Sequence, residues 1–125
     1  MLVGKTKNLD DSFALLEKEI FDLKKFKDKA EVTFKHNDVR LKKTVSGVET
    51  VRFNPFKGDG SGGNQSFATA FLNEEKNGVV ISSMYSRDHV SVFSKQIKNL
   101  HSEQGELTAE EKDALNKASA ATETK

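Results

Sequence analysis

The chain contains no cysteine, which excludes disulfide bonds, zinc–thiolate sites and cysteine nucleophiles. No stretch of it approaches the ~18 consecutive apolar residues that a membrane-spanning helix needs. The formal net charge is only +1, so bulk charge gives no attraction to nucleic acid or to an anionic membrane. With 125 residues, the chain has room for one domain with a core of its own.

Glycine and proline are absent between Gly4 and Gly47, and this long stretch without helix breakers predicts an N-terminal helix. Asn8 is placed to cap its start, which puts Asp10 and Asp11 in the first turn, where acidic side chains favour the helix dipole. Gly47 is placed to close its end in a left-handed cap. We therefore predict that residues 1–47 form an amphipathic, coiled-coil-like helix.

The apolar residues of this predicted helix follow alternating steps of four and three, which is the heptad pattern of a coiled coil. In the second half of the helix the pattern is diluted by polar residues such as Lys27 and Asn37. We expect the apolar seam to pair with a second copy of the chain, most simply as a dimer; the alternative is that it packs on the sheet that follows. The seam residues are Leu9, Phe13, Leu16, Ile20 and Leu23.

The middle of the chain changes to short runs of β-branched and aromatic residues, which are typical of strands. Phe67 and Phe71 alternate with small residues within one such run. The links between runs are short, which predicts an antiparallel meander, and Asn77-Gly78 suits a hairpin turn with a left-handed residue. Pro55 marks either an edge strand or the end of its strand. The four predicted strands are Val48–Phe56, Gln65–Asn73, Val79–Tyr85 and Val90–Ile97.

A short helix is predicted to close the fold. Thr108 and Glu111 have the spacing of a capping box, in which each side chain bonds to the other residue's backbone N–H. We expect this helix to run to about Ala118 and residues 119–125 to form a disordered tail. The predicted fold class is therefore α+β, with a small α+β domain over residues 48–118. The residues available for packing are Leu107, Ala114, Leu115 and Ala118.

A glycine-rich loop, GDGSGG, separates the first two predicted strands. A phosphate-binding loop would need a lysine after its glycines and a helix behind them, whereas here Lys57 comes first and a strand follows. A calcium loop would need several acidic ligands, and only Asp59 is present. We interpret the loop as a flexible connection; the alternative is that its backbone amides bind a small ligand or an anion. Its glycines are Gly58, Gly60, Gly62 and Gly63.

No constellation of catalytic or metal-ligating residues is recognisable. The three histidines, His36, His89 and His101, fall in different predicted elements, and the paired carboxylates fall at helix starts or in a turn. We therefore predict no enzyme activity, no metal and no cofactor.

One small polar patch is a candidate ligand site. Arg52 and Asn54 share one side of the first predicted strand, and Arg87 lies at the tip of a turn. The alternative is that Arg52 pairs with an acid of the long helix and that Asn54 ends its strand.

Phenylalanines on strands can also bind single-stranded nucleic acid by stacking. The RNA-recognition signature, however, is absent around Phe53, Phe56 and Phe67. Core packing is the preferred interpretation of these rings.

Several short sequence segments, which we call blocks, together resemble an uncharacterised bacterial family, the domain-of-unknown-function family 4446. They cover nearly the whole chain, although no single block is specific. The resemblance implies a coiled-coil-like helix, a small domain behind it and one transmembrane helix upstream of both; it implies no activity, substrate or cofactor. The blocks are Gly4–Leu9, Gly47–Phe56, Gly62-Gly63, Ser66–Ala68, Asn77–Ser83, the residues Arg87, Val92, Lys95 and Ile97, and Leu107–Lys112.

Together, the seam, the missing chemical constellation and the resemblance predict a non-catalytic interaction or scaffold module that self-associates through its N-terminal helix. We expect the chain itself to be soluble, an unidentified protein to be its partner, and the full-length protein to be tethered to the bacterial inner membrane, on the cytoplasmic side. The alternatives are a small-ligand or anion-binding domain that uses the glycine-rich loop, and single-stranded nucleic-acid binding by the sheet.

Overall fold

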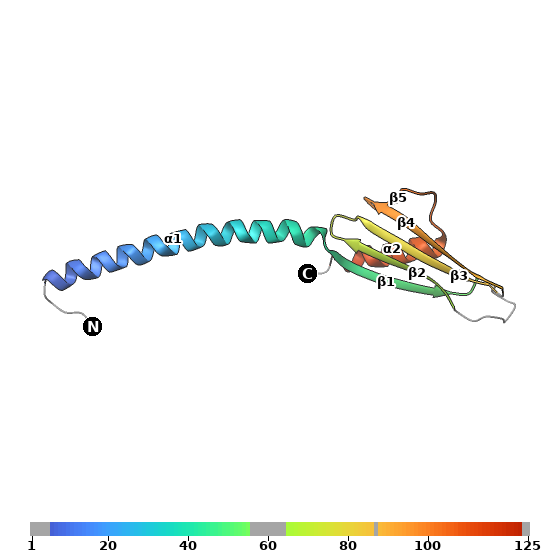
Figure 1. Cartoon of the computed structure of the whole chain (residues 1–125), viewed down its shortest axis with the longest axis horizontal. Helices are drawn as coiled ribbons and strands as arrows, with labels where there is room; N and C mark the ends of the chain where they lie inside the picture. Colours follow the sequence, from blue (N-terminus) through green and yellow to red (C-terminus); the bar gives the residue numbers. More distant parts are fainter. Residues whose placement is uncertain (1–5, 56–64, 87, 124–125) are drawn as a thin grey trace. The chain divides into compact units, whose positions relative to one another are not determined.

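The computed structural model describes residues 6–55, 65–86 and 88–123, with side chains from residue 9 onward. The chain divides into two compact units: a helical unit that ends at Arg40 and a sheet unit that begins at Leu41 (Figure 1). The division falls inside the long helix, seven residues before the boundary expected from the sequence. The structure confirms the α+β class, with a long helix, an antiparallel sheet and a short helix in that order.

Helix α1 spans Thr6–Lys43. It begins earlier than the predicted cap at Asn8, because nothing between Thr6 and Asn8 breaks a helix. Its large apolar side chains are 47–69% exposed within the single chain, and Phe21 lies under the ammonium group of Lys25, 5.3 Å from the ring centre. The helix is thus confirmed, whereas its pairing into a coiled coil stays a prediction.

The helix ends at Lys43 and not at Gly47, which corrects the predicted cap. The backbone N–H and the hydroxyl of Thr44 both donate to the Leu41 carbonyl, at 3.1 and 2.7 Å, and so close the last turn. The side-chain amide of Asn73 donates to the Lys43 carbonyl at 3.2 Å. Val45 already pairs with Asn73 in the sheet, so side chains of the sheet unit take the capping role that a glycine was expected to fill.

Among the described residues, the sheet has five antiparallel strands in the order β1-β2-β3-β4-β5, one more than predicted. The meander of sequential neighbours is confirmed. The first strand starts and ends three residues earlier than expected, and Pro55 lies just beyond its end, at the edge of the sheet. The strands are β1 (Val45–Phe53), β2 (Ser66–Asn73), β3 (Gly78–Tyr85), β4 (Val90–Lys98) and β5 (His101–Ser102).

The fifth strand is a two-residue pairing of His101 and Ser102 with the end of β4. Asn99 and Leu100 join the two strands, and both have positive φ angles, 51° and 68°. Leu100 tolerates this conformation because its side chain packs against the core and its N–H donates to the Lys76 carbonyl at 3.0 Å. A leucine in a left-handed turn gives no signal in the sequence, which is why this strand was missed.

The β2–β3 hairpin also differs from the expected form. Lys76, with φ of 68°, is its left-handed residue, and not Asn77 or Gly78. Gly78 belongs to β3, where an added Cβ would collide with the Phe71 carbonyl. The side chain of Asn73 accepts from the Asn77 N–H at 3.0 Å and fixes the turn from within.

Helix α2 (Ala109–Ala121) packs across one face of the sheet, mainly on β1 and β2 (Figure 1). The contact is close enough that a Cβ on Gly47 would collide with the Ala118 carbonyl. The helix continues three residues beyond its predicted end, and Thr122 is buried after it, so residues 119–123 are not the disordered tail that we expected. The core consists of Ala68, Ala70, Leu72, Val80, Ile97, Ala114, Leu115 and Ala118.

The opposite face of the sheet also carries apolar side chains. Phe71, Val79 and Ile81 are half-buried there, and Val48 and Val92 are 50% and 64% exposed. Within the sheet unit, the described residues place no helix over this face. Neither helix in the described part of the chain combines the length and the apolar character that crossing a membrane requires.

Candidate functional site

The most distinctive polar feature of the sheet unit is a buried carboxylate. Glu111, in the first turn of α2, is only 2% exposed. It accepts hydrogen bonds from the Ser82 hydroxyl on β3 at 2.6 Å, the Lys95 ammonium on β4 at 2.9 Å and the Thr108 N–H at 2.9 Å. The three donors come from two strands and a helix cap. This carboxylate therefore joins α2 to β3 and β4, strands on which the helix packs less than on β1 and β2. We call Ser82, Lys95, Thr108 and Glu111 the polar cluster.

The local sequence explains why Glu111 lies there. Thr108 and Glu111 form the predicted capping box, with the Thr108 hydroxyl accepting from the Glu111 N–H at 3.2 Å, and this prediction is confirmed. Glu111 also precedes Ala114, Leu115 and Ala118 by three, four and seven residues, which puts it on the apolar face of α2. The capping role and the buried face therefore coincide at one residue.

The carboxylate stays ionised in this position. Burial raises the pKa of Glu111, but the hydrogen bonds from Lys95, Ser82 and the Thr108 backbone lower it by more, so the pKa lies below its ordinary value of 4.5. Lys95 also donates to the Glu106 carbonyl at 2.8 Å. A carboxylate with a lowered pKa is poorly suited to proton transfer near neutral pH. The polar cluster is therefore better suited to holding α2 in place on β3 and β4 than to acid–base catalysis.

Beside the polar cluster lies a pocket of about 280 Å³. Its apolar walls are Phe53 from the end of β1, Met84 from β3 and Phe93 from β4. Met84 and Phe93 are 40% and 48% exposed. The pocket exists because α2 packs mainly on β1 and β2 and leaves this part of β3 and β4 without a helix over it.

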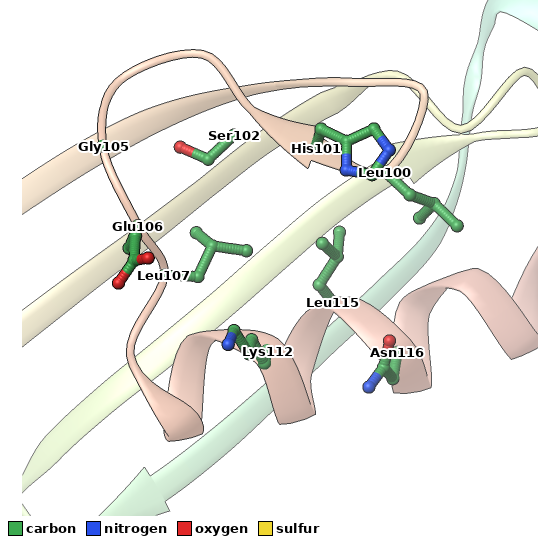
Figure 2. A pocket seen from close by; sticks show the side chains of 9 residues that line it. All are labelled: Leu100, His101, Ser102, Gly105, Glu106, Leu107, Lys112, Leu115 and Asn116. Atoms are coloured by element: carbon green, nitrogen blue, oxygen red, sulfur yellow. The ribbon is translucent and has the colours of Figure 1, made fainter.

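A second, more polar depression of about 410 Å³ lies between α2 and the segment that leads into it (Figure 2). Figure 2 shows Leu107 and Leu115 facing each other across it, with His101 on one side and Lys112 and Asn116 along the helix. His101 is exposed, and no group of three or more potential metal ligands is found among the described residues. The depression offers no convergent set of polar groups.

The structure describes only two of the three residues of the candidate ligand patch, so this patch stays a prediction. Arg52 is exposed and stacks over Phe67, with the guanidinium carbon 6.0 Å from the ring centre. Asn54 lies just beyond the end of β1 and has an interaction of its own. Arg87 lies outside the described residues, as do the glycines of the loop, Gly58, Gly60, Gly62 and Gly63.

The polar cluster was missed by the sequence analysis. Its one usable signal was Glu111, a carboxylate on the face of α2 that also carries Ala114, Leu115 and Ala118. Ser82 and Lys95 gave none, because a serine and a lysine on strands are ordinary residues until the register brings them under α2.

Comparison with known proteins gives a family and no more. No curated protein and no solved structure matched the chain. A family model described as "Protein of unknown function (DUF4446)" matched residues 1–119. This match spans most of the chain and confirms the resemblance found in the sequence blocks. The protein therefore belongs to the DUF4446 family.

Proposed function

We propose that the protein is a non-catalytic interaction module that self-associates through the seam of its helical unit. One observation carries the proposal: the five seam residues, which we expected to be covered by a partner, are exposed within the single chain. Their exposed fractions are 47% for Leu9, 57% for Phe13, 53% for Leu16, 51% for Ile20 and 65% for Leu23.

The energetics of a solitary helix support a partner. Isolated helices in water are stabilised mainly by packing of an apolar face, and intrinsic propensity alone is marginal. Full burial of a leucine, isoleucine or phenylalanine side chain contributes about 1.5–3 kcal/mol. The five seam residues of each helix are about half exposed in the single chain. Burying the rest of their surface on two helices contributes free energy of the same order as the roughly 4–15 kcal/mol that association costs.

Charge complementarity favours a second copy in parallel orientation. In the heptad that places Leu16 and Leu23 at d positions, Glu19 falls at g and Lys24 at the following e. In a parallel, in-register pair, g of one helix lies beside the next e of its partner. Glu19 of each copy then faces Lys24 of the other, and the symmetric pair makes this contact twice.

The polar residues of the seam favour a dimer. Lys27 continues the seam at an a position and Asn37 at a d position. A polar residue at a seam position fixes register and oligomer size at a cost in stability, and the long stem of a lysine can keep its ammonium group in water at the edge of a two-stranded pair.

Sedimentation equilibrium tests the proposal. We expect Leu16→Glu with Ile20→Glu to convert the oligomer to a monomer, because two charges would be buried in the seam. The matched control is Leu15→Glu with Phe21→Glu, neighbouring residues that lie off the seam and are 64% and 61% exposed. A chain that remains monomeric at ~100 µM, an association weaker than roughly 5.5 kcal/mol, would contradict the proposal; so would equal effects of the two double variants.

Fewer observations support membrane tethering, ligand binding by the glycine-rich loop and nucleic-acid binding. Membrane tethering of the full-length protein rests on the family resemblance, and fractionation of cells that express the natural protein tests it. The glycine loop of the ligand-binding alternative lies outside the described residues. For nucleic-acid binding, the ring of Phe53 is half-buried and packs against the core, which favours its structural role.

A further inference from the structure

The pocket beside the polar cluster suggests a second activity, independent of self-association. We propose that the pocket walled by Phe53, Met84 and Phe93 binds a small, uncharged, largely apolar molecule that carries one hydrogen-bonding group. Its size fits this class: a cavity of ~150 Å³ holds benzene, drug-sized pockets begin near 300 Å³, and this one measures about 280 Å³. One fused pair of rings fills such a space.

The walls provide the apolar part of the site. Met84 and Phe93 keep 40% and 48% of their surface exposed, although both lie on the face of the sheet that α2 packs against. A ligand seated between them and Phe53 would remove this apolar surface from water, which is the main source of affinity in small-molecule sites.

The floor of the pocket, formed by Ser82, Lys95, Thr108, Glu110 and Glu111, provides the polar part of the site. Lys95 and Glu111 form an ion pair at 2.9 Å, so an anionic ligand would lose its hydration without meeting an unpaired positive charge. The remaining charge in the lining, Glu110, repels anions. The Ser82 hydroxyl donates to Glu111 at 2.6 Å and keeps a lone pair with which to accept from a ligand. The floor therefore disfavours anions and fits an uncharged ligand with one polar hydrogen.

The site is also preorganised. The Glu111 carboxylate is held by three hydrogen bonds, one of which belongs to the capping box of α2, and Ser82 and Phe93 are direct neighbours in the β3–β4 register. Groups fixed before binding lose little further freedom when the ligand arrives.

Indole is a suitable probe, because it is uncharged, has one N–H and fluoresces, while the chain contains no tryptophan. We expect a saturable blue shift of indole fluorescence with a Kd on the order of 1 mM or tighter. Indole-3-carboxylate, the matched anion, is expected to bind at least tenfold more weakly. No saturable indole signal, or equal binding of the anion, would overturn the proposal.

Two adjacent substitutions locate the site. Met84→Lys puts a charge in the pocket wall and is expected to weaken indole binding at least tenfold. Tyr85→Lys, with 41% exposure against 40% for Met84, lies on the opposite face of the same strand and is expected to leave binding unchanged.

Amide chemical shifts of the unmodified chain give a measurement that does not depend on the folding of a variant. We expect indole to perturb the amides of Ser82, Met84, Phe93 and Lys95. Perturbations confined to the opposite face, to the larger depression or to the seam would overturn the proposal. Repeating the titration with the Leu16→Glu, Ile20→Glu chain separates this site from the self-association, since the pocket contains no seam residue.

Discussion

At the scale of single residues, Glu111 connects more parts of the sheet unit than any other side chain described above. It completes the N-terminal cap of α2, accepts from Ser82 on β3 and pairs with Lys95 on β4. Lys95 is itself only 18% exposed. A buried ion pair of this kind adds little when compared with a well-packed apolar pair, but removing one partner leaves the other charge uncompensated.

We predict that Glu111→Gln lowers the free energy of unfolding at pH 7 by about 2–4 kcal/mol, measured by urea denaturation. The glutamine keeps the shape but leaves the Lys95 ammonium without a counter-ion. The matched control is Glu110→Gln, one position earlier and less buried, which is expected to change stability by less than about 0.5 kcal/mol. Similar losses in the two variants would show that the cluster has no special role.

The same substitution should change the response to acid. Because the pKa of Glu111 is lowered by folding, the folded state stays unprotonated where the unfolded state already binds a proton. The stability that the Glu111 carboxylate contributes is therefore fully present at pH values above its ordinary pKa of 4.5 and is lost as the pH falls through the lower pKa of the folded state. In Glu111→Gln, this part of the acid dependence should disappear from the stability profile.

At the scale of elements, helix α2 is held at both ends by other parts of the sheet unit. Its N-terminus is joined to β3 and β4 through Glu111. Its C-terminal end is bound by Lys76 in the β2–β3 hairpin, whose ammonium group donates to the Ser119 carbonyl at 3.1 Å, the Thr122 hydroxyl at 2.7 Å and the Glu123 carboxylate at 2.9 Å. A cation at this end also complements the helix dipole. These contacts explain why α2 extends three residues beyond its predicted end.

We predict that Lys76→Met destabilises the sheet unit by about 1–2 kcal/mol and raises amide hydrogen exchange in the last turn of α2 first. The control is Lys117→Met, which removes an exposed lysine 3.6 Å from Asp113 within the same helix. Exposed pairs of this type contribute little, so its exchange should match that of the unmodified chain. Unchanged protection of Ala120 and Ala121 in Lys76→Met would contradict the capping role.

At the scale of the whole molecule, the proposed parallel pairing has a geometric consequence. In a parallel, in-register pair the two Leu9 side chains meet, whereas in an antiparallel pair that aligns Leu9 with Leu23 they lie roughly 21 Å apart, because a helix rises 1.5 Å per residue. The absence of cysteine from the chain makes this distance easy to probe with a single introduced thiol.

We predict that Leu9→Cys forms a disulfide-linked dimer under mild oxidation, since a disulfide needs Cα atoms within about 7 Å. Leu15→Cys, which lies off the seam, should cross-link far more slowly. Non-reducing electrophoresis reads out both variants. Efficient cross-linking of Leu15→Cys, or none of Leu9→Cys in a chain that still sediments as an oligomer, would contradict the parallel arrangement.

Most elements of this fold could be predicted from local patterns. The periods of apolar residues predicted strands β2 to β4 to within one residue at each boundary, and the Thr108–Glu111 spacing predicted the start of α2. The long helix was also predicted, but its end was placed four residues too late. The predictions failed where a distant residue decides the outcome. Asn73 contributes to ending α1, Lys76 extends α2, and the packing of Leu100 permits the turn to β5.

Local sequence patterns were enough to predict the order and type of every element except β5, because helix and strand periods and capping pairs act between residues that are near one another along the chain. They also determined that one face of α1 is apolar. Ser82, Lys95 and Glu111 come together, and a pocket remains beside them, only when the chain is folded. Those contacts depend on strand register and on where α2 crosses the sheet, and both are set by packing between residues that are far apart in the chain.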